Sequence, residues 1–212
     1  MENKTKFING IIIGLVLLLV IVIILISVSI VLSKRNRRFL KDQKVFLDSY
    51  NTQLKNISES IKNCKFIGAN DYSYNDQRIH LDDIFVTDKI IFVLKPYMYD
   101  SDSSIQGDYL SNEWILTKSN GKKSKIPNQL ISLKKSMNNF GLLFSNEMSI
   151  CSIFVHNLST ELNIEDVPSF QGICNIKDLC ASIKSVYNSN INSMYNQSIS
   201  TIFNVLNNKI AK

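Results

Sequence analysis

The chain has 212 residues, of which 24 are basic and 18 acidic, and its net charge is +6. This length holds at most one or two domains and excludes a large multidomain enzyme. Residues 1–41 contain seven basic residues and one acidic residue, whereas residues 42–212 contain 17 of each. The basic surplus is therefore confined to one short segment, which favours a membrane protein over a domain that is basic throughout.

A run of 25 residues without charge, residues 8–32, follows a short tail of residues 1–7. It exceeds the roughly 20 apolar residues that cross a hydrocarbon core, so it predicts a transmembrane helix. A cleaved signal peptide is the alternative. Its apolar region would be about 7 to 15 residues long and would end in small residues, whereas this run ends in Val31, Leu32, Ser33 and Lys34.

A basic juxtamembrane segment, residues 33–41, follows the span, and only Lys4 and Lys6 precede it. Because positive charge accumulates on the cytoplasmic side, this asymmetry predicts a single-pass protein of the cell membrane with its C-terminal part in the cytoplasm. Four of the basic residues are expected to lie at the membrane interface near anionic headgroups: Lys34, Arg35, Arg37 and Arg38.

The cytoplasmic location predicts that the four cysteines, Cys64, Cys151, Cys174 and Cys180, are reduced core residues. Their spacing matches no zinc motif, so no metal and no cofactor are expected. Gly10 and Gly14 form a GxxxG pattern within the span, which is a weak indication of a homodimer.

The first predicted element after the anchor is a helix over about 41–63, whose apolar face comprises Phe46, Tyr50, Leu54, Ile57 and Ile61. A short strand at 65–68 follows. The segments 81–87 and 90–97 are rich in β-branched and aromatic residues and predict a tight hairpin. A second hairpin, 114–117 with 124–126, surrounds Asn120-Gly121.

The second half of the chain begins with a predicted helix carrying Leu130, Leu133, Met137 and Phe140 on one side. A buried strand at 149–156 and a short strand at 172–174 come next. Two helices complete the chain, one from about residue 176 and one carrying Ile191, Met194, Tyr195, Ile199, Ile202 and Leu206. This order predicts a mixed α/β domain over 42–187 and a C-terminal helix within 188–212.

The strand Leu81-Asp82-Asp83-Ile84-Phe85-Val86-Thr87 and the following Ile90-Ile91-Phe92-Val93-Leu94 resemble the hallmark strands of the NERD (nuclease-related domain) family. Asp83 matches the family aspartate. Gly107, Trp114 and Pro127-Asn128 fall at matching places, and 149–156 resembles a later family strand. The resemblance covers roughly residues 41–187, and family members often follow a membrane helix.

The resemblance implies a restriction-endonuclease-like mixed sheet flanked by helices. It also implies an aspartate and an acid/lysine pair on adjacent strands, as in the PD-(D/E)xK nucleases. In such a site two carboxylates hold Mg²⁺ and the lysine steadies the attacking water and the phosphoryl charge. Here the acid and lysine positions are occupied by Lys95 and Tyr97, and the family's helix-start glutamine aligns with Ser132.

These departures predict a degenerate site in which Lys95 forms a cross-strand ion pair with Asp83. Pro96 predicts an edge or a bulge in this strand. The favoured function is a nuclease-like module that binds a nucleic acid or a protein partner. Six lysines in an acid-free stretch are candidate phosphate contacts: Lys118, Lys122, Lys123, Lys125, Lys134 and Lys135.

Two alternatives remain open from the sequence. The first is an active Mg²⁺-dependent nuclease whose catalytic residues have moved to other positions. The second is a purely structural membrane protein. No Ser-His-Asp constellation, P-loop or dinucleotide-binding motif is visible.

Overall fold

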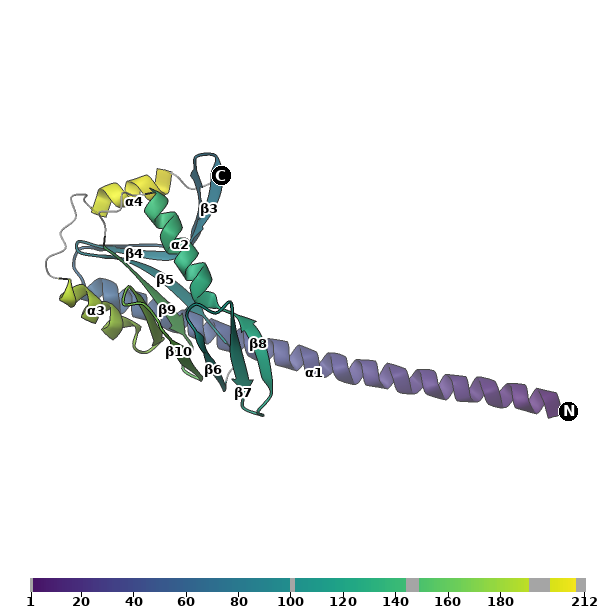
Figure 1. Cartoon of the computed structure of the whole chain (residues 1–212). Helices are drawn as coiled ribbons and strands as arrows, with labels where there is room; N and C mark the ends of the chain where they lie inside the picture. Colours follow the sequence, from purple (N-terminus) through teal and green to yellow (C-terminus); the bar gives the residue numbers. More distant parts are fainter. Residues whose placement is uncertain (1, 100–101, 144–148, 191–198, 209–212) are drawn as a thin grey trace. The chain divides into compact units, whose positions relative to one another are not determined.

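The computed structural model describes residues 2–99, 102–143, 149–190 and 199–208 (Figure 1). The helices are α1 (Glu2–Ser60), α2 (Gln129–Leu143), α3 (Leu179–Ser189) and α4 (Ile199–Asn208). The first strands are β1 (Cys64–Ile67), β2 (Asn70–Tyr74), β3 (Gln77–Leu81), β4 (Asp83–Thr87), β5 (Ile91–Tyr97) and β6 (Ser103–Asp108). The later strands are β7 (Glu113–Lys118), β8 (Lys123–Pro127), β9 (Ile150–His156), β10 (Thr160–Glu165) and β11 (Gln171–Asn175).

The chain divides into two compact units, Met1–Val45 and Phe46–Lys212, and the boundary falls inside α1. In the first unit the large apolar side chains from Leu18 to Leu32 are 42–64% exposed. Among the described residues, α1 is the one helix long and apolar enough to cross a membrane, and an 18-residue window of its stretch Leu18–Ser60 has a mean hydropathy of 2.4.

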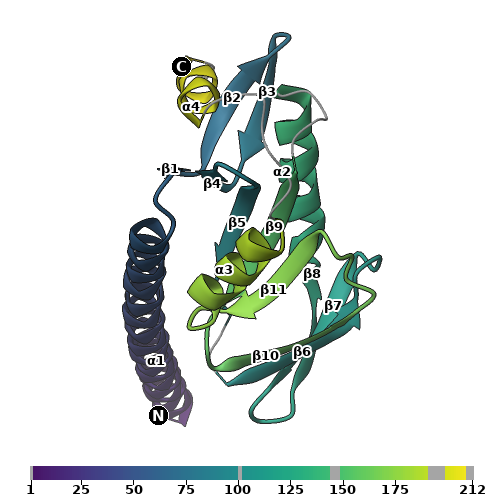
Figure 2. The same ribbon diagram turned by 90° about the vertical axis from the view of Figure 1, so that its left-hand side faces the viewer.

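The second unit is a mixed α/β domain, as the sequence predicts. Its main sheet has the strand order β1-β4-β5-β9-β11, and its second sheet has the order β10-β6-β7-β8. β2 and β3 form a separate antiparallel hairpin. Figure 2 shows the two larger sheets side by side in this unit, with α3 against β11 and β9.

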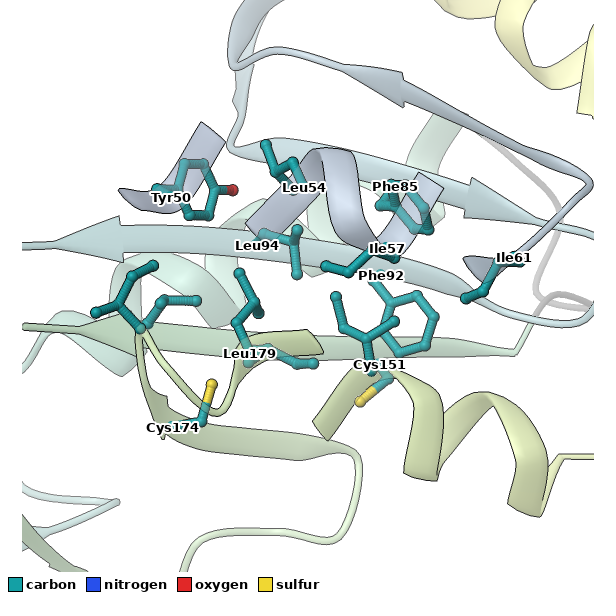
Figure 3. Close-up of a cluster of buried hydrophobic side chains, with 14 of the residues drawn as sticks. Tyr50, Leu54, Ile57, Ile61, Phe85, Phe92, Leu94, Cys151, Cys174 and Leu179 are labelled. Carbon is teal, nitrogen blue, oxygen red and sulfur yellow. The ribbon is translucent and has the colours of Figure 1, made fainter. Parts of the chain in front are cut away.

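The two faces of the main sheet contribute to different hydrophobic clusters. The five apolar residues predicted from Phe46 to Ile61 are all buried, and they pack with Phe85, Phe92 and α3 on one side of the sheet. Figure 3 shows this packing around Tyr50, Leu54 and Ile57. Alternate residues of the same strands, such as Val93, pack on the other side with α2, while Ile84 packs with α2 and α4. A one-residue step along β4 or β5 therefore moves a side chain from the α1 side to the α2 side.

Both predicted hairpins are confirmed. β4 and β5 pair antiparallel through the turn at Asp88 and Lys89, and β7 and β8 pair around Asn120-Gly121. Gly121 has φ +78°, a conformation that glycine adopts without a steric cost. β9 is confirmed as a buried strand between β5 and β11, and the helix predicted from Leu130 onward is α2.

Four strands and one helix differ from the prediction. β2, β6 and β10 were not predicted, and β3 was only touched by the segment 81–87. The last helix is described from Ile199 to Asn208, so Ile191, Met194 and Tyr195 lie outside the described residues. Ile202 and Leu206 of α4 are fully buried against Ile84 and Val86, which makes α4 part of the core of the second unit.

Candidate functional site

The site suggested by the sequence lies where β4 begins opposite β5. Asp83 is paired in register with Leu94, so the next residues outward, Asp82 and Lys95, lie on the opposite face from Asp83. Asp83 faces α1. Asp82 therefore lies on the α2 side, and its backbone N–H donates to Ser136 Oγ of α2 at 2.7 Å.

Asp83 is held by two hydrogen bonds on the α1 side. The hydroxyl of Tyr50 donates to its Oδ2 at 2.9 Å, and the backbone N–H of Ala69 donates to its Oδ1 at 2.6 Å. Burial raises the pKa of the Asp83 carboxyl, although both hydrogen bonds oppose this effect by stabilising the charged form. Asp83 therefore joins α1 to the start of β4 and to the loop after β1.

The prediction that Lys95 pairs with Asp83 is wrong. Lys95 Nζ lies 3.2 Å from Asp82 Oδ1, because the register places Asp82 and not Asp83 on the face of Lys95. Both side chains are largely buried, with 10% of Asp82 and 18% of Lys95 exposed. Asp82 Oδ2 is buried and has no hydrogen-bond partner among the described residues.

The ion pair continues into a network on the β2–β3 hairpin. His80 Nε2 lies 3.8 Å from Asp82 Oδ1, and His80 Nδ1 lies 2.8 Å from Asp71 Oδ1. The guanidinium of Arg78 contacts Asp71 Oδ2 at 2.9 Å. The hydrogen bond with His80, followed by the charge of Arg78, lowers the pKa of Asp71. Within this network Lys95 contacts Asp82 and Arg78 contacts Asp71, whereas neutral donors hold Asp83.

Tyr97, at the family lysine position, lies among aromatic rings. Its ring centroid is 4.8 Å from that of Tyr99 and 6.2 Å from that of Phe154. β5 is an interior strand and its register with β9 is unbroken through Pro96, so neither the edge strand nor the bulge predicted from Pro96 occurs. Its pairing with β4 nevertheless ends at Leu94, so Pro96 is paired in register only with β9 within the described sheet.

No group of three or more His, Cys, Asp or Glu side chains that could hold a metal ion occurs among the described residues. All four cysteines are free thiols. Burial raises the pKa of Cys151 to about 11 and that of Cys174 to about 12, so both remain protonated in the core. Cys151 and Cys174 are core residues as predicted, whereas Cys64 and Cys180 are only partly buried against the same cluster.

The other positions that resemble the family have structural contacts. A Cβ atom at Gly107 would lie 2.2 Å from Cδ1 of the fully buried Trp114, so the ring packs directly on the glycine backbone. Asn128 donates to the carbonyls of Tyr109 and Ser111 and accepts from the N–H of Leu130. It therefore caps α2 and fixes the loop between β6 and β7. Ser132 lies in the first turns of α2, where its hydroxyl donates to Gln129 O.

The structure divides the six candidate lysines between two elements. Four of them lie on the β7–β8 hairpin: Lys118, Lys122, Lys123 and Lys125. Lys134 and Lys135 are exposed on α2, and Lys134 Nζ lies 5.8 Å from the ring centroid of Tyr109. Lys125 Nζ contacts Glu113 Oε2 at 2.8 Å.

The predicted membrane-interface residues, Lys34, Arg35, Arg37 and Arg38, are exposed along α1 within the first unit. The residue that the sequence analysis missed is Asp82. Only the register at the start of β4 distinguishes Asp82 from Asp83, and that register depends on the residue at which the strand begins.

No protein-family model, no curated protein and no solved structure matches this chain.

Proposed function

We propose that the chain is a single-pass protein of the cell membrane whose α/β domain lies in the cytoplasm. The length and apolarity of α1 support insertion, and the basic residues after position 33 support the orientation. Protease added to intact cells is expected to spare a C-terminal tag and to digest it only after permeabilisation. Digestion of the tag in intact cells would contradict this orientation.

The domain is proposed to have a restriction-endonuclease-like fold of the NERD type and to lack nuclease activity. The observation that carries this proposal is the contact of 3.2 Å between Lys95 and Asp82. The resemblance implies a metal-binding acid at position 95, where the Lys95 ammonium instead neutralises the Asp82 carboxylate. At 4 Å and an effective dielectric near 20, one pair of unit charges interacts by about 4 kcal/mol, so an ammonium there strongly disfavours Mg²⁺.

The test is cleavage by the full chain purified in a neutral detergent. We expect no Mg²⁺- or Mn²⁺-dependent cleavage of duplex or single-stranded DNA. The double variant Lys95→Glu, Tyr97→Lys is expected to bind divalent metal more tightly than the wild type, because a second carboxylate then lies beside Asp82. Metal-dependent cleavage by the unmodified chain that Asp82→Ala or Asp83→Ala abolishes would establish the active nuclease instead.

The role proposed for this inactive domain is binding of a nucleic acid at the inner face of the membrane. The lysines of the β7–β8 hairpin support it, because they are mostly exposed and residues 118–135 contain no acidic residue, although Lys125 pairs with Glu113 of β7. Binding measured over a salt series is the test, since phosphate contacts make affinity fall steeply with salt. Absence of binding would favour a protein partner, for which Ile115 on the same hairpin, 48% exposed, offers an apolar contact.

A further inference from the structure

The charge of the second unit is segregated. The stretch 118–135 carries six lysines and no acidic residue. The rest of residues 42–212 carries 11 basic and 17 acidic residues. A polyanion is therefore repelled by most of this domain and attracted by one part of it.

The second sheet presents this part on its exposed face. Inward side chains such as Trp114 and Leu116 are buried, and the alternating side chains of the same strands are exposed or half-buried. The register places Ile115 opposite Lys125 and Thr117 opposite Lys123 on the exposed face. Lys122 lies in the turn between β7 and β8, so the basic residues line one edge of the sheet.

The opposite edge of the same sheet is acidic. Glu161 and Glu165 of β10 are exposed and lie in register with Ser104 and Asp108 of β6. Three strand spacings separate β8 from β10, which is about 14 Å and exceeds the screening length of about 8 Å at physiological salt. A flat anionic surface, such as a membrane, that covered this face would contact both the basic edge at β8 and the acidic edge at β10. An elongated polyanion that lies along β8 would contact the basic edge alone.

Aromatic side chains are not available for stacking on this edge. Tyr109 and Trp114 are the aromatic residues of the stretch 103–135, and they are 7% and 0% exposed. Proteins that hold single-stranded nucleic acids without sequence preference stack successive bases on exposed aromatic rings. A lysine ammonium is a point charge that suits phosphates, and contacts to phosphates carry no sequence information.

Taking the proposed nucleic-acid binding as its basis, we propose that the basic edge formed by Lys122 and Lys123 binds the phosphate backbone of a duplex. Lys125, on the same edge, is already paired with Glu113. The contact is electrostatic and independent of base sequence. It excludes the bases, because no exposed ring among the described residues of the hairpin reaches them.

The experiment measures fluorescence anisotropy with the full chain in neutral detergent. The ligands are a short DNA duplex, each of its strands alone, and a second duplex of different sequence. We expect the two duplexes to bind equally and more tightly than either strand. Lys122→Gln with Lys123→Gln removes two phosphate contacts and is expected to weaken duplex binding about 60-fold at ~0.1 M salt.

The matched control is Lys55→Gln with Lys177→Gln, which removes two exposed lysines away from this edge and is expected to leave duplex affinity unchanged. Equal or tighter binding of a single strand, or wild-type affinity in the Lys122, Lys123 variant, would overturn the duplex assignment. Failure of every nucleic acid to bind would overturn the proposed function as well.

The remaining outcome concerns lipid. Acylation of Lys122 and Lys123 can be compared in nanodiscs of phosphatidylserine and of phosphatidylcholine. If no duplex binds and the two lysines are protected only by phosphatidylserine, the basic edge binds anionic headgroups. That result would also overturn the inference.

Discussion

The ion pair between Asp82 and Lys95 makes a quantitative prediction about stability. Its side chains are 10% and 18% exposed, so removing one partner leaves the other charge largely buried. Breaking a buried pair in this way typically costs 3–5 kcal/mol. Because both groups keep some contact with water, we expect a loss of about 3 kcal/mol for Lys95→Met, at the lower end of that range.

The assay is urea denaturation followed by the fluorescence of Trp114, the one tryptophan of the chain, which is fully buried in the second unit. The variants are Lys95→Met, Asp82→Asn and the double variant. The double variant is expected to lose less stability than the sum of the two single variants, by a coupling energy of about 2 kcal/mol. For a unit of this size, 3 kcal/mol corresponds to a fall in melting temperature of about 6–12 °C.

The control pair is Lys125 with Glu113, whose contact of 2.8 Å is shorter but whose side chains are 76% and 56% exposed. Exposed pairs contribute about 0.2–1 kcal/mol, so the cycle Lys125→Met, Glu113→Gln is expected to give no more than that. A coupling for Asp82 and Lys95 no larger than the control would refute the view that burial, and not distance, sets the strength of this pair.

Other predictions concern the backbone contacts around the site. Gly107→Ala should lower the free energy of unfolding by about 2 kcal/mol, because the added Cβ would overlap the Trp114 ring. The fluorescence emission of Trp114 in the native state should shift as well. Asn128→Ala should cost about 2 kcal/mol in the same assay through loss of the α2 cap and of two carbonyl partners, and Asn128→Asp should retain the cap. Asp83 has a pKa raised above its unfolded value, so the native state binds more protons between the two pKa values. Stability contributed by Asp83 should therefore rise as pH falls through the raised pKa, and Asp83→Asn should remove this dependence in urea melts at several pH values.

Local patterns in the sequence were sufficient for much of the fold. The helical face from Phe46 to Ile61 and the turn at Asn120-Gly121 depend only on neighbouring residues, and both agree with the structure. The β2–β3 hairpin also had a local signal, because Asn75 and Asp76 both adopt positive φ in its turn. That signal was not recognised, since the flanking segments contain polar residues such as Ser73 and Gln77.

Parallel pairing had no such local signal. β10 pairs with β6 across more than fifty residues, and the two strands contain few of the apolar residues that mark a strand. The burial of α4 against Ile84 and Val86 is equally non-local. These contacts depend on the packed core, which a single sequence specifies only through the sum of many weak preferences.

The candidate site was limited by a one-residue uncertainty in register. Adjacent residues of a strand face opposite sides, so an error of one position exchanges Asp82 for Asp83. Asp83 lies under α1 with Tyr50, whereas Asp82 lies under α2 with Lys95. The residue types were therefore visible in the sequence, but their partners were not.

The position of Lys95 weighs against metal chemistry more strongly than its residue type alone. A divalent ion at Asp82 would have to lie within a few ångströms of the Lys95 ammonium, where the repulsion is about 8 kcal/mol at 4 Å and an effective dielectric near 20. Displacing the ammonium instead would leave it largely buried without its carboxylate, at a cost similar to that expected for breaking the pair. Either route opposes the ion, so Asp82 in the wild-type chain acts as the partner of Lys95, and the lysines exposed on the β7–β8 hairpin become the better candidates for function.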